Sequence, residues 1–197
     1  MTEVVVATRN DKKLRELKRY LKSVKADVIS LKSLAHAPGI REDKSTFKGN
    51  AIKKAVTISK FTKGVVLADD SGLCVDILDG QPGVKSARFA GRNKKDHDNN
   101  TKLLKMMEGV PSGKRQARFV CAIAIADNGK AVKIIEEYCK GRIAFSIRGR
   151  HGFGYDPLFL IPKYKKTFGE LGLKVKDKMS HRSKALKKAR KFLRGYI

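Results

Sequence analysis

The sequence contains no tryptophan and only three cysteines among its 197 residues. Cys74, Cys121 and Cys139 are odd in number and form no Cys-x-x-Cys pair, which argues against a disulfide framework. We therefore expect three buried free thiols in a protein of a reducing compartment.

Long apolar runs are also missing. The longest, FVCAIAIA from Phe119, is too short to cross a bilayer as a helix. The opening MTEVVVATRN lacks the basic start and long apolar stretch of a signal peptide. We expect a cytoplasmic protein that does not associate with membranes.

Acidic residues are scarce, with 19 Asp and Glu against 45 Lys and Arg, so the formal net charge is +26. Such a surface attracts polyanions, including nucleotides and nucleic acids. The alternative is a solvated basic surface without a specific partner. The charge alone does not distinguish these interpretations, because the cations are spread along the whole chain.

The hydrophobic pattern predicts β-α-β units and a hairpin, hence an α/β fold with a mixed, twisted sheet and flanking helices. No linker or internal repeat divides the chain, so residues 1–197 are predicted to form one domain, or two lobes that share one sheet. A turn at DNGK joins two long strands, and a loop is predicted over residues 79–92. The predicted strands are residues 3–8, 27–31, 65–68, 73–77, 117–126, 132–145 and 158–161, and the predicted helices are residues 11–21, 45–61 and 99–107 and a C-terminal helix from His181.

The segment VVVATRNDKKLREL predicts a buried strand, a tight polar turn and a helix. Backbone N–H groups at a helix start are unsatisfied donors that attract anions. With the side chains of Thr8, Asn10 and Lys13 they resemble a phosphate-binding site, although neither a Walker A loop nor Gly-x-Gly-x-x-Gly is present. The alternative is an ordinary helix start, capped by Asn10 or Asp11.

Two adjacent carboxylates, Asp69 and Asp70, end the predicted strand VVLA. Because side chains alternate along a strand, only one of them should face a given site unless the strand ends there. With Glu42 from a preceding polar loop they suit Mg²⁺, which binds one or two carboxylates together with phosphate oxygens. The alternative is a turn over Asp-Asp-Ser-Gly.

Glycines surround an aromatic residue in HGFGYDP. Gly152 and Gly154 leave the backbone beside Phe153 bare, so a flat ligand such as a nucleobase can stack there. Asp156 could accept a hydrogen bond or orient the N–H groups of the loop. Alternatively, Phe153 is a core residue and Asp156 precedes a strand.

The segment VKDKMSHRSKAL predicts a helix capped by Ser180, with His181 and Arg182 in its first turn. The double donor of Arg182 suits a purine carbonyl or a phosphate, and Lys176 could add a second cation. The alternative is a solvated basic face, which we favour for the lysines that follow.

Taken together, these segments resemble the inosine triphosphate pyrophosphatases, enzymes that hydrolyse non-standard purine nucleoside triphosphates. The resemblance covers essentially the whole chain. Its motifs are TRNDKK, EDKSTFKGNA, LADDSGL, PGVKSARFAG, QARFVCA, GFGYDPLF and SHRSKAL, in family order. The sequence departs from the family at Arg9, where a small residue is usual, at Gly49, where an acid is frequent, and at Lys44 and Ser183, where glycine is frequent.

The resemblance implies two lobes with an active site in the cleft between them, a homodimer, and conversion of ITP, dITP and XTP to monophosphate and pyrophosphate. It implies Mg²⁺ bound by Glu42 and Asp70, with Asp70 as general base and Asp69 and Lys54 assisting at the metal and phosphates. The implied substrate-binding residues are Thr8, Asn10 and Lys13 for the triphosphate, Ser71 for the substrate, Phe153, Gly154, Tyr155 and Asp156 for the base, and Lys176, His181 and Arg182 over base and phosphates.

Two other functions remain open from the sequence. The charge is also typical of an RNA- or ribosome-associated protein without catalysis, which would bind RNA in a strongly salt-dependent way. A pyrophosphatase acting on modified pyrimidine nucleotides is the second alternative.

Overall fold

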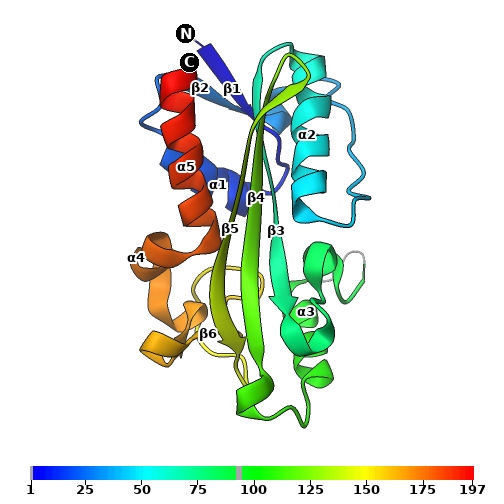
Figure 1. Cartoon of the computed structure of the whole chain (residues 1–197), viewed down its shortest axis with the longest axis vertical. Helices are drawn as coiled ribbons and strands as arrows, with labels where there is room; N and C mark the ends of the chain where they lie inside the picture. Colours follow the sequence, from blue (N-terminus) through cyan, green and yellow to red (C-terminus); the bar gives the residue numbers. More distant parts are fainter. Residues whose placement is uncertain (1, 92–94) are drawn as a thin grey trace. The chain divides into compact units, whose positions relative to one another are not determined.

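A computed structural model of the chain describes residues 2–91 and 95–197. Arg92, the last residue of the predicted loop 79–92, lies outside these residues. The described residues form a seven-stranded sheet in the order β2-β1-β3-β4-β5-β6-β7 (Figure 1). Strand β1 pairs parallel with β2 and β3, whereas β6 pairs antiparallel with β5 and β7, which confirms the predicted mixed sheet.

Helices and strands follow the order expected of β-α-β units with an inserted hairpin. The strands are β1 (Thr2–Val6), β2 (Ala26–Ser30), β3 (Val65–Val75), β4 (Gln116–Asp127), β5 (Lys130–Ile143), β6 (Phe159–Ile161) and β7 (Lys166–Thr167). The α-helices are α1 (Asp11–Leu21), α2 (Phe47–Thr62), α3 (Asp96–Met106), α4 (Phe168–Met179) and α5 (His181–Tyr196). Short 3-10 helices are η1 (Leu31–Ser33), η2 (Asp76–Leu78), η3 (Gly83–Arg88), η4 (Ser112–Lys114) and η5 (Pro162–Tyr164).

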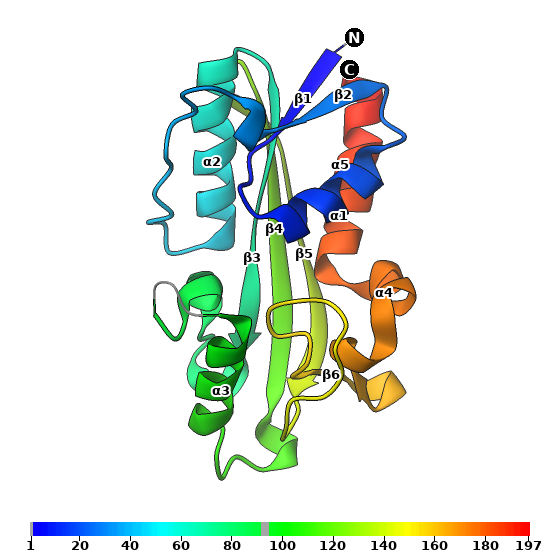
Figure 2. The ribbon, with the colours of Figure 1, turned by 180° about the vertical axis from the view of Figure 1, so that it is seen from behind.

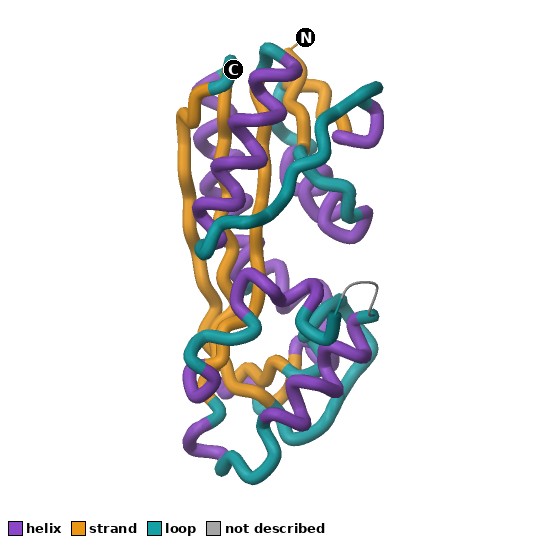
Figure 3. The backbone as a smooth tube through the Cα atoms, turned by 90° about the vertical axis from the view of Figure 1, so that its right-hand side faces the viewer, coloured by secondary structure: helices purple, strands orange, loops and turns teal. Residues whose placement is uncertain are grey.

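The chain divides into two compact units. The first unit holds the chain up to Asp70 together with Cys121–Glu137 and Lys184–Ile197. The second holds Ser71–Val120 and Tyr138–Ser183. Three long strands, β3, β4 and β5, contribute residues to both units (orange in Figure 3).

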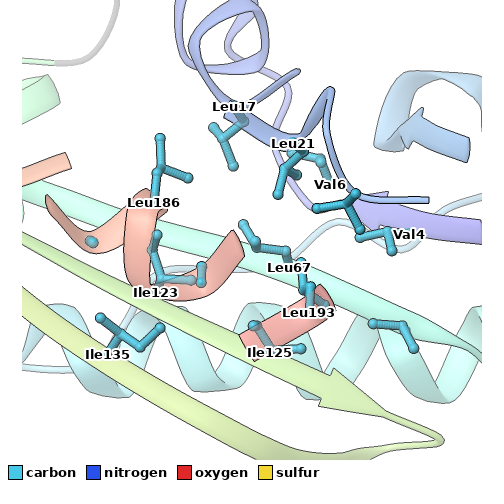
Figure 4. Packing of buried hydrophobic residues seen from close by; sticks show 14 of the residues in the cluster. Val4, Val6, Leu17, Leu21, Leu67, Ile123, Ile125, Ile135, Leu186 and Leu193 are labelled. Atoms are coloured by element: carbon cyan, nitrogen blue, oxygen red, sulfur yellow. The ribbon is translucent and has the colours of Figure 1, made fainter. Parts of the chain in front are cut away.

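The core of the first unit lies where α1 and α5 cover one face of its strands. Leu17 and Leu21 of α1 meet Leu186 and Leu193 of α5 above alternate residues of β1, β3, β4 and β5 (Figure 4). The residues between these alternate ones, such as Val66, are equally buried and point to the opposite face. Helix α2 lies there, as Figures 1 and 2 show from both sides.

The core of the second unit is aromatic. Phe119, Phe159 and Phe168 form one stack, with the Phe119 and Phe159 ring centroids 4.3 Å apart. Tyr155 and the apolar residues of α3 join the same cluster. The segment between β5 and β6, residues 144–158, crosses this unit without helix or strand (yellow in Figure 2).

Several predicted elements are confirmed, one predicted strand end is wrong, and two elements were not predicted. Helix α1 has the predicted bounds, and the DNGK hairpin turn forms with positive φ at Asn128 and Gly129. Thr46 caps α2 through its side chain. However, no strand ends at Ala68, because β3 continues without a break to Val75. Helix α4 and strand β7 were not predicted at all.

The three cysteines are free and buried, as expected. Across residues 2–91 and 95–197, none of the helices is both long enough and apolar enough to span a membrane.

Candidate active site

The start of α1 is capped rather than open. Asn10 Oδ1 accepts hydrogen bonds from the backbone N–H groups of Lys12 and Lys13, at 3.0 and 3.2 Å. The Thr8 hydroxyl accepts a bond from Asn10 N. The alternative of a capped helix is therefore confirmed, and two of the N–H donors expected to bind an anion are already used. Any anion held here would depend mainly on side chains.

Lys13, in the first turn of α1, supplies such a side chain. Its Nζ lies 2.9 Å from Oδ2 of Asp69, whose carboxylate is almost fully buried. Arg9, which departs from the family pattern, donates to the carbonyl of Ala37 at 3.3 Å. Asp69 therefore fixes Lys13, while Arg9 is bound to the loop after β2.

Asp70 points to the other face of β3, as strand alternation predicts. Asn50 of α2 donates to Asp70 Oδ2 at 3.1 Å, and Lys54 Nζ lies 3.8 Å from Asp70 Oδ1. The same ammonium group lies 2.6 Å from Glu42 Oε1 and donates to the carbonyl of Asp69 at 2.7 Å. Lys54 thus contacts the carboxylates of Glu42 and Asp70 and the backbone carbonyl of Asp69.

Asn50 is a residue that the sequence analysis did not single out. It is buried, accepts a hydrogen bond from Lys44 N and donates to the Lys44 carbonyl. One amide therefore holds both the loop that carries Glu42 and the carboxylate of Asp70. The motif EDKSTFKGNA contains this asparagine, but nothing local indicated its partner 20 residues away.

Burial and the charges of this cluster shift the pKa values of Asp70 and Lys54. Burial raises the pKa of Asp70, and the nearby charges of Lys54 and Lys13 offset only part of that effect. Burial acts to lower the pKa of Lys54, but the negative charges of Asp70, Asp69 and Glu42 outweigh it and raise the pKa. Asp70 is thus a better proton acceptor than an ordinary carboxylate, while Lys54 stays charged.

The donor set of this cluster fits a hard cation. Glu42 and Asp70 both approach the Lys54 ammonium and offer only oxygen ligands. In the described part of the chain, no group of three or more His, Cys, Asp or Glu side chains could hold a metal by itself. A cation here would need further oxygens from a ligand, which is how Mg²⁺ usually binds with phosphates.

The second unit contains the other group of predicted residues. The ring of Phe153 is approached by two cations, with Lys176 Nζ 4.8 Å and Arg182 Cζ 5.2 Å from its centroid. Arg182 also donates to the Ser71 hydroxyl at 2.7 Å. Such a ring, half-buried and flanked by guanidinium and ammonium groups, is suited to stacking with an electron-rich flat ligand.

Asp156 closes the glycine-rich loop of residues 152–156. Its Oδ2 accepts hydrogen bonds from Phe153 N at 2.8 Å and from Lys176 Nζ at 2.5 Å. Burial raises the pKa of Asp156, and the charge of Lys176 offsets this only in part. Gly152 has φ of +81°, and a Cβ there would lie 1.9 Å from Asp156 Oδ2, so the loop requires glycine.

Helix α3 binds the same glycine-rich loop, a contact that the sequence did not predict. Gly154 N donates to Asp96 Oδ2 at 2.9 Å, and Asn100 Nδ2 donates to the Gly154 carbonyl at 2.8 Å. Asp96 and Asn100 are one helical turn apart, so both face the loop. The segment DHDNN shows the four-residue spacing of Asp96 and Asn100, but their partner Gly154 lies more than 50 residues away.

Two predicted residues of this unit, Tyr155 and His181, are buried and contact core residues. Tyr155 is buried in the aromatic core and donates its hydroxyl to the Ser86 carbonyl at 2.9 Å. Burial raises the pKa of this hydroxyl. The His181 ring stacks on Phe119 with centroids 4.7 Å apart. Both residues therefore support the loop and the start of α5, whatever else they contact.

The structure thus gathers the predicted residues into two clusters, one in each unit. The phosphate cluster comprises Thr8, Asn10, Lys13, Glu42, Lys54, Asp69 and Asp70 in the first unit. The aromatic cluster comprises Ser71, Phe153, Gly154, Tyr155, Asp156, Lys176, His181 and Arg182 in the second unit. Asp70 and Ser71 are consecutive, so one peptide bond of β3 joins the two clusters along the chain.

Comparison with known proteins identifies the family. The model of the Ham1 family matches residues 4–192. The chain belongs to the Ham1 family. It is 50% identical over 196 residues to a dITP/XTP pyrophosphatase of Desulforamulus reducens, covering 99% of this chain and 98% of the relative. It is also 50% identical over 188 residues to a dITP/XTP pyrophosphatase of Bacillus licheniformis, covering 95% of this chain and 96% of the relative.

Solved Ham1 structures have the same fold. The Staphylococcus aureus Ham1 protein matches with a TM-score of 0.90 and 37% identity, covering 100% of both chains. A HAM1 protein from Coxiella burnetii matches with a TM-score of 0.89 and 37% identity over 98% of both chains. The resemblance inferred from the sequence motifs is therefore confirmed at the level of family and fold.

Proposed function

We propose that this Ham1-family protein is a nucleoside triphosphate pyrophosphatase that removes non-standard purine nucleotides, ITP, dITP and XTP, from the nucleotide pool. The observation that carries the proposal is the 50% identity, over almost the full length of both chains, to proteins named dITP/XTP pyrophosphatase. The two clusters support it, because one offers cations and carboxylates and the other an aromatic ring with hydrogen-bonding groups.

In this proposal the phosphate cluster acts on the triphosphate. Lys13, which Asp69 orients, binds the phosphate charge together with Thr8 and Asn10. Glu42 and Asp70 would hold Mg²⁺, while Lys54 keeps both carboxylates in place. When bound, this cation neutralises phosphate charge and lowers the pKa of nearby water.

Asp70 serves as the general base. It takes a proton from the water that attacks the α-phosphorus, and the bond from that phosphorus to the bridging oxygen of the β-phosphate breaks. Pyrophosphate leaves and the nucleoside monophosphate remains. In the metal-free chain, burial raises the pKa of Asp70, which makes this carboxylate a better proton acceptor there. Lys13 stabilises the charge of the departing pyrophosphate.

In the same proposal, the aromatic cluster binds the purine base and selects among purines. Phe153 would stack on the purine, and Arg182, held by Ser71, would donate to the carbonyl at C6 of hypoxanthine or xanthine. Adenine presents an amino group there, so a donor would face a donor and buried groups would stay unpaired. The resemblance to the family also leads us to propose a homodimer in the cytoplasm.

A pyrophosphate-release assay tests the function. We expect Mg²⁺-dependent release from ITP, XTP and dITP at a much higher kcat/KM than from GTP or ATP. Asp70→Asn should keep the fold and lose at least about a hundredfold in kcat. Lys105→Gln, an exposed substitution on α3, serves as the control and should leave the rate unchanged.

Metal binding needs a separate readout. Isothermal titration with Mg²⁺ and a non-hydrolysable ITP analogue should show that Glu42→Gln and Asp70→Asn each weaken the Mg²⁺-dependent part of binding. Release of pyrophosphate from modified pyrimidine nucleotides only, or from no nucleotide at all, would contradict the proposed function.

A further inference from the structure

The outward faces of α1 and α5 carry two rows of exposed cations. On α1 and its C-terminal cap they follow helical spacing i, i+3, i+4, i+7, and on α5 the spacing is similar, so each row lies on one side of its helix. We call these residues together the basic face. It consists of Arg15, Lys18, Arg19 and Lys22 on α1 and Lys184, Lys187, Lys188, Lys191 and Arg194 on α5, all exposed.

The two rows belong to one surface of the first unit. Leu17 and Leu21 on the inner side of α1 share a core cluster with Leu186 and Leu193 on the inner side of α5 (Figure 4). The guanidinium Nε of Arg194 donates to the carbonyl of Ser23, just after α1, at 3.2 Å. The helices therefore lie side by side, as Figures 1 and 2 agree, and we infer that their exposed rows form one surface.

The two helices of this surface carry few acidic residues of their own. Helix α5 contains no acidic residue, and the acids of α1 are Asp11 and Glu16. Asp11 is engaged by Lys32 at 2.6 Å, outside the rows, and Glu137 of β5 pairs with Lys188. The nine cations thus produce a field that the proposed reaction does not require, since the phosphate cluster uses Lys13 and Lys54 instead.

We propose that the basic face binds the phosphodiester backbone of nucleic acid, independently of base sequence. The row from Lys184 to Arg194 spans ten residues of α-helix, or roughly 15 Å, which matches about four phosphates along one strand of a duplex. The second row on α1 can meet further phosphates. Because each phosphate neutralised by a cation releases counterions, the binding depends steeply on salt.

An anionic membrane is the less suitable partner. Helices that bind membranes insert an apolar face below the headgroups. The apolar face of α5, with Ala185, Leu186, Ala189 and Leu193, is buried in the core of the first unit instead. The face that remains exposed on α1 and α5 is charged, which suits a polyphosphate chain that stays in water.

A charge-matched pair of variants tests the proposal. The test variant carries Lys18→Gln, Lys22→Gln, Lys187→Gln and Lys191→Gln, all on the basic face. The control variant carries Lys105→Gln, Lys114→Gln, Lys163→Gln and Lys174→Gln, exposed lysines of the second unit. Four substitutions lower the net charge of either variant from +26 to +22, since 26 minus 4 is 22.

Binding to a fluorescent RNA duplex of about 20 base pairs is measured by anisotropy over a range of salt concentrations. The wild-type chain should bind at physiological salt, and the test variant should bind about tenfold more weakly, with a salt slope lower by about two to four. The control variant should stay within about threefold of wild type. Equal weakening of both variants would show that diffuse net charge suffices and would overturn the proposal.

Two further outcomes also overturn it. One is the lack of any duplex binding by the wild type at physiological salt. The other is stronger binding to phosphatidylglycerol vesicles than to RNA, with the same loss in the test variant. Both variants should hydrolyse ITP at the wild-type rate. If the wild type is inactive on every nucleotide, the proposed function is wrong. The anisotropy titration still tests RNA binding, because it does not depend on catalysis.

Discussion

Lys176 Nζ lies 2.5 Å from Asp156 Oδ2 in the interior of the second unit, and the two side chains are only 6% and 2% exposed. The same carboxylate oxygen accepts the hydrogen bond of Phe153 N at 2.8 Å. A buried charge pair therefore sets the conformation of the loop that presents Phe153. In the proposed function, the stacking surface depends on an electrostatic contact rather than on packing alone.

Substitution of either partner of this pair alone should be strongly destabilising. Asp156→Asn or Lys176→Met leaves an uncompensated polar or charged group in the interior, which typically costs about 3–5 kcal/mol of unfolding free energy. The double variant should cost much less than the sum of the two single variants, because neither charge then stays buried. Urea unfolding of all four chains measures the coupling, with exposed Lys174→Met as the control. Additive losses would show that the two groups are energetically independent.

The pH dependence of stability should carry the signature of Asp156. Burial raises the pKa of this carboxyl above its ordinary value of 3.8. The folded chain therefore binds more protons than the unfolded chain between the two pKa values, so the contribution of Asp156 to stability falls as pH rises through this window. The unfolding free energy of wild type minus that of the double variant Asp156→Asn, Lys176→Met should decrease from acid pH upward. An increase with pH would mean that Lys176 outweighs burial.

Local sequence signals predicted the elements whose geometry is set by a few neighbouring residues. The Asn128-Gly129 pair fits a hairpin turn because both residues adopt positive φ, and Asn10 could be predicted as a cap because its side chain reaches two residues ahead. The turn considered as an alternative at Asp69-Asp70 does not form, because both residues lie within β3. Lys13 and Asn50 bind the two carboxylates, and no local pattern indicates these sequence-distant partners.

Long-range contacts could not be predicted from local patterns. Helix α4 was missed because Gly172, with φ of +72°, interrupts its periodicity. Ser71 and Arg182 are 111 residues apart, and only the fold brings them together. The family motifs named most residues of both clusters, yet gave no role to Asn50, whose amide donates to the Lys44 carbonyl and to the Asp70 carboxylate.

Helix α3 should control how well the glycine-rich loop binds a base. Asp96→Ala removes the acceptor of Gly154 N, and Asn100→Ala removes the donor to the Gly154 carbonyl. Each lost hydrogen bond should raise KM for ITP by about tenfold, corresponding to roughly 1–1.5 kcal/mol, with a smaller change in kcat. Steady-state kinetics with ITP measures both constants.

Two matched variants show whether the effect belongs to the loop. Asp98→Ala removes the capping contact to Lys95 N in the same first turn of α3 but leaves Gly154 untouched, so KM should stay near the wild-type value. Asp96→Asn keeps an oxygen acceptor for Gly154 N and should restore most of the affinity. If Asp98→Ala raises KM as much as Asp96→Ala, the effect comes from general weakening of the helix.

Arg182 should determine the choice between purines. Its guanidinium lies against the Phe153 ring and donates to Ser71 Oγ, which places an arginine side chain beside a base stacked on that ring. Arg182→Ala should lower kcat/KM for ITP by about one to two orders of magnitude and change the already low value for ATP little, because adenine offers no acceptor at C6.

Arg190→Ala serves as the control. Arg190 lies on the same helix, but it belongs to neither cluster and is remote from Phe153 in sequence. The measured quantity is the ratio of kcat/KM for ITP to kcat/KM for ATP in each variant. An equal loss for ITP and ATP would mean that Arg182 binds phosphate or supports the loop, and base selection would then have to be assigned to other groups around Phe153.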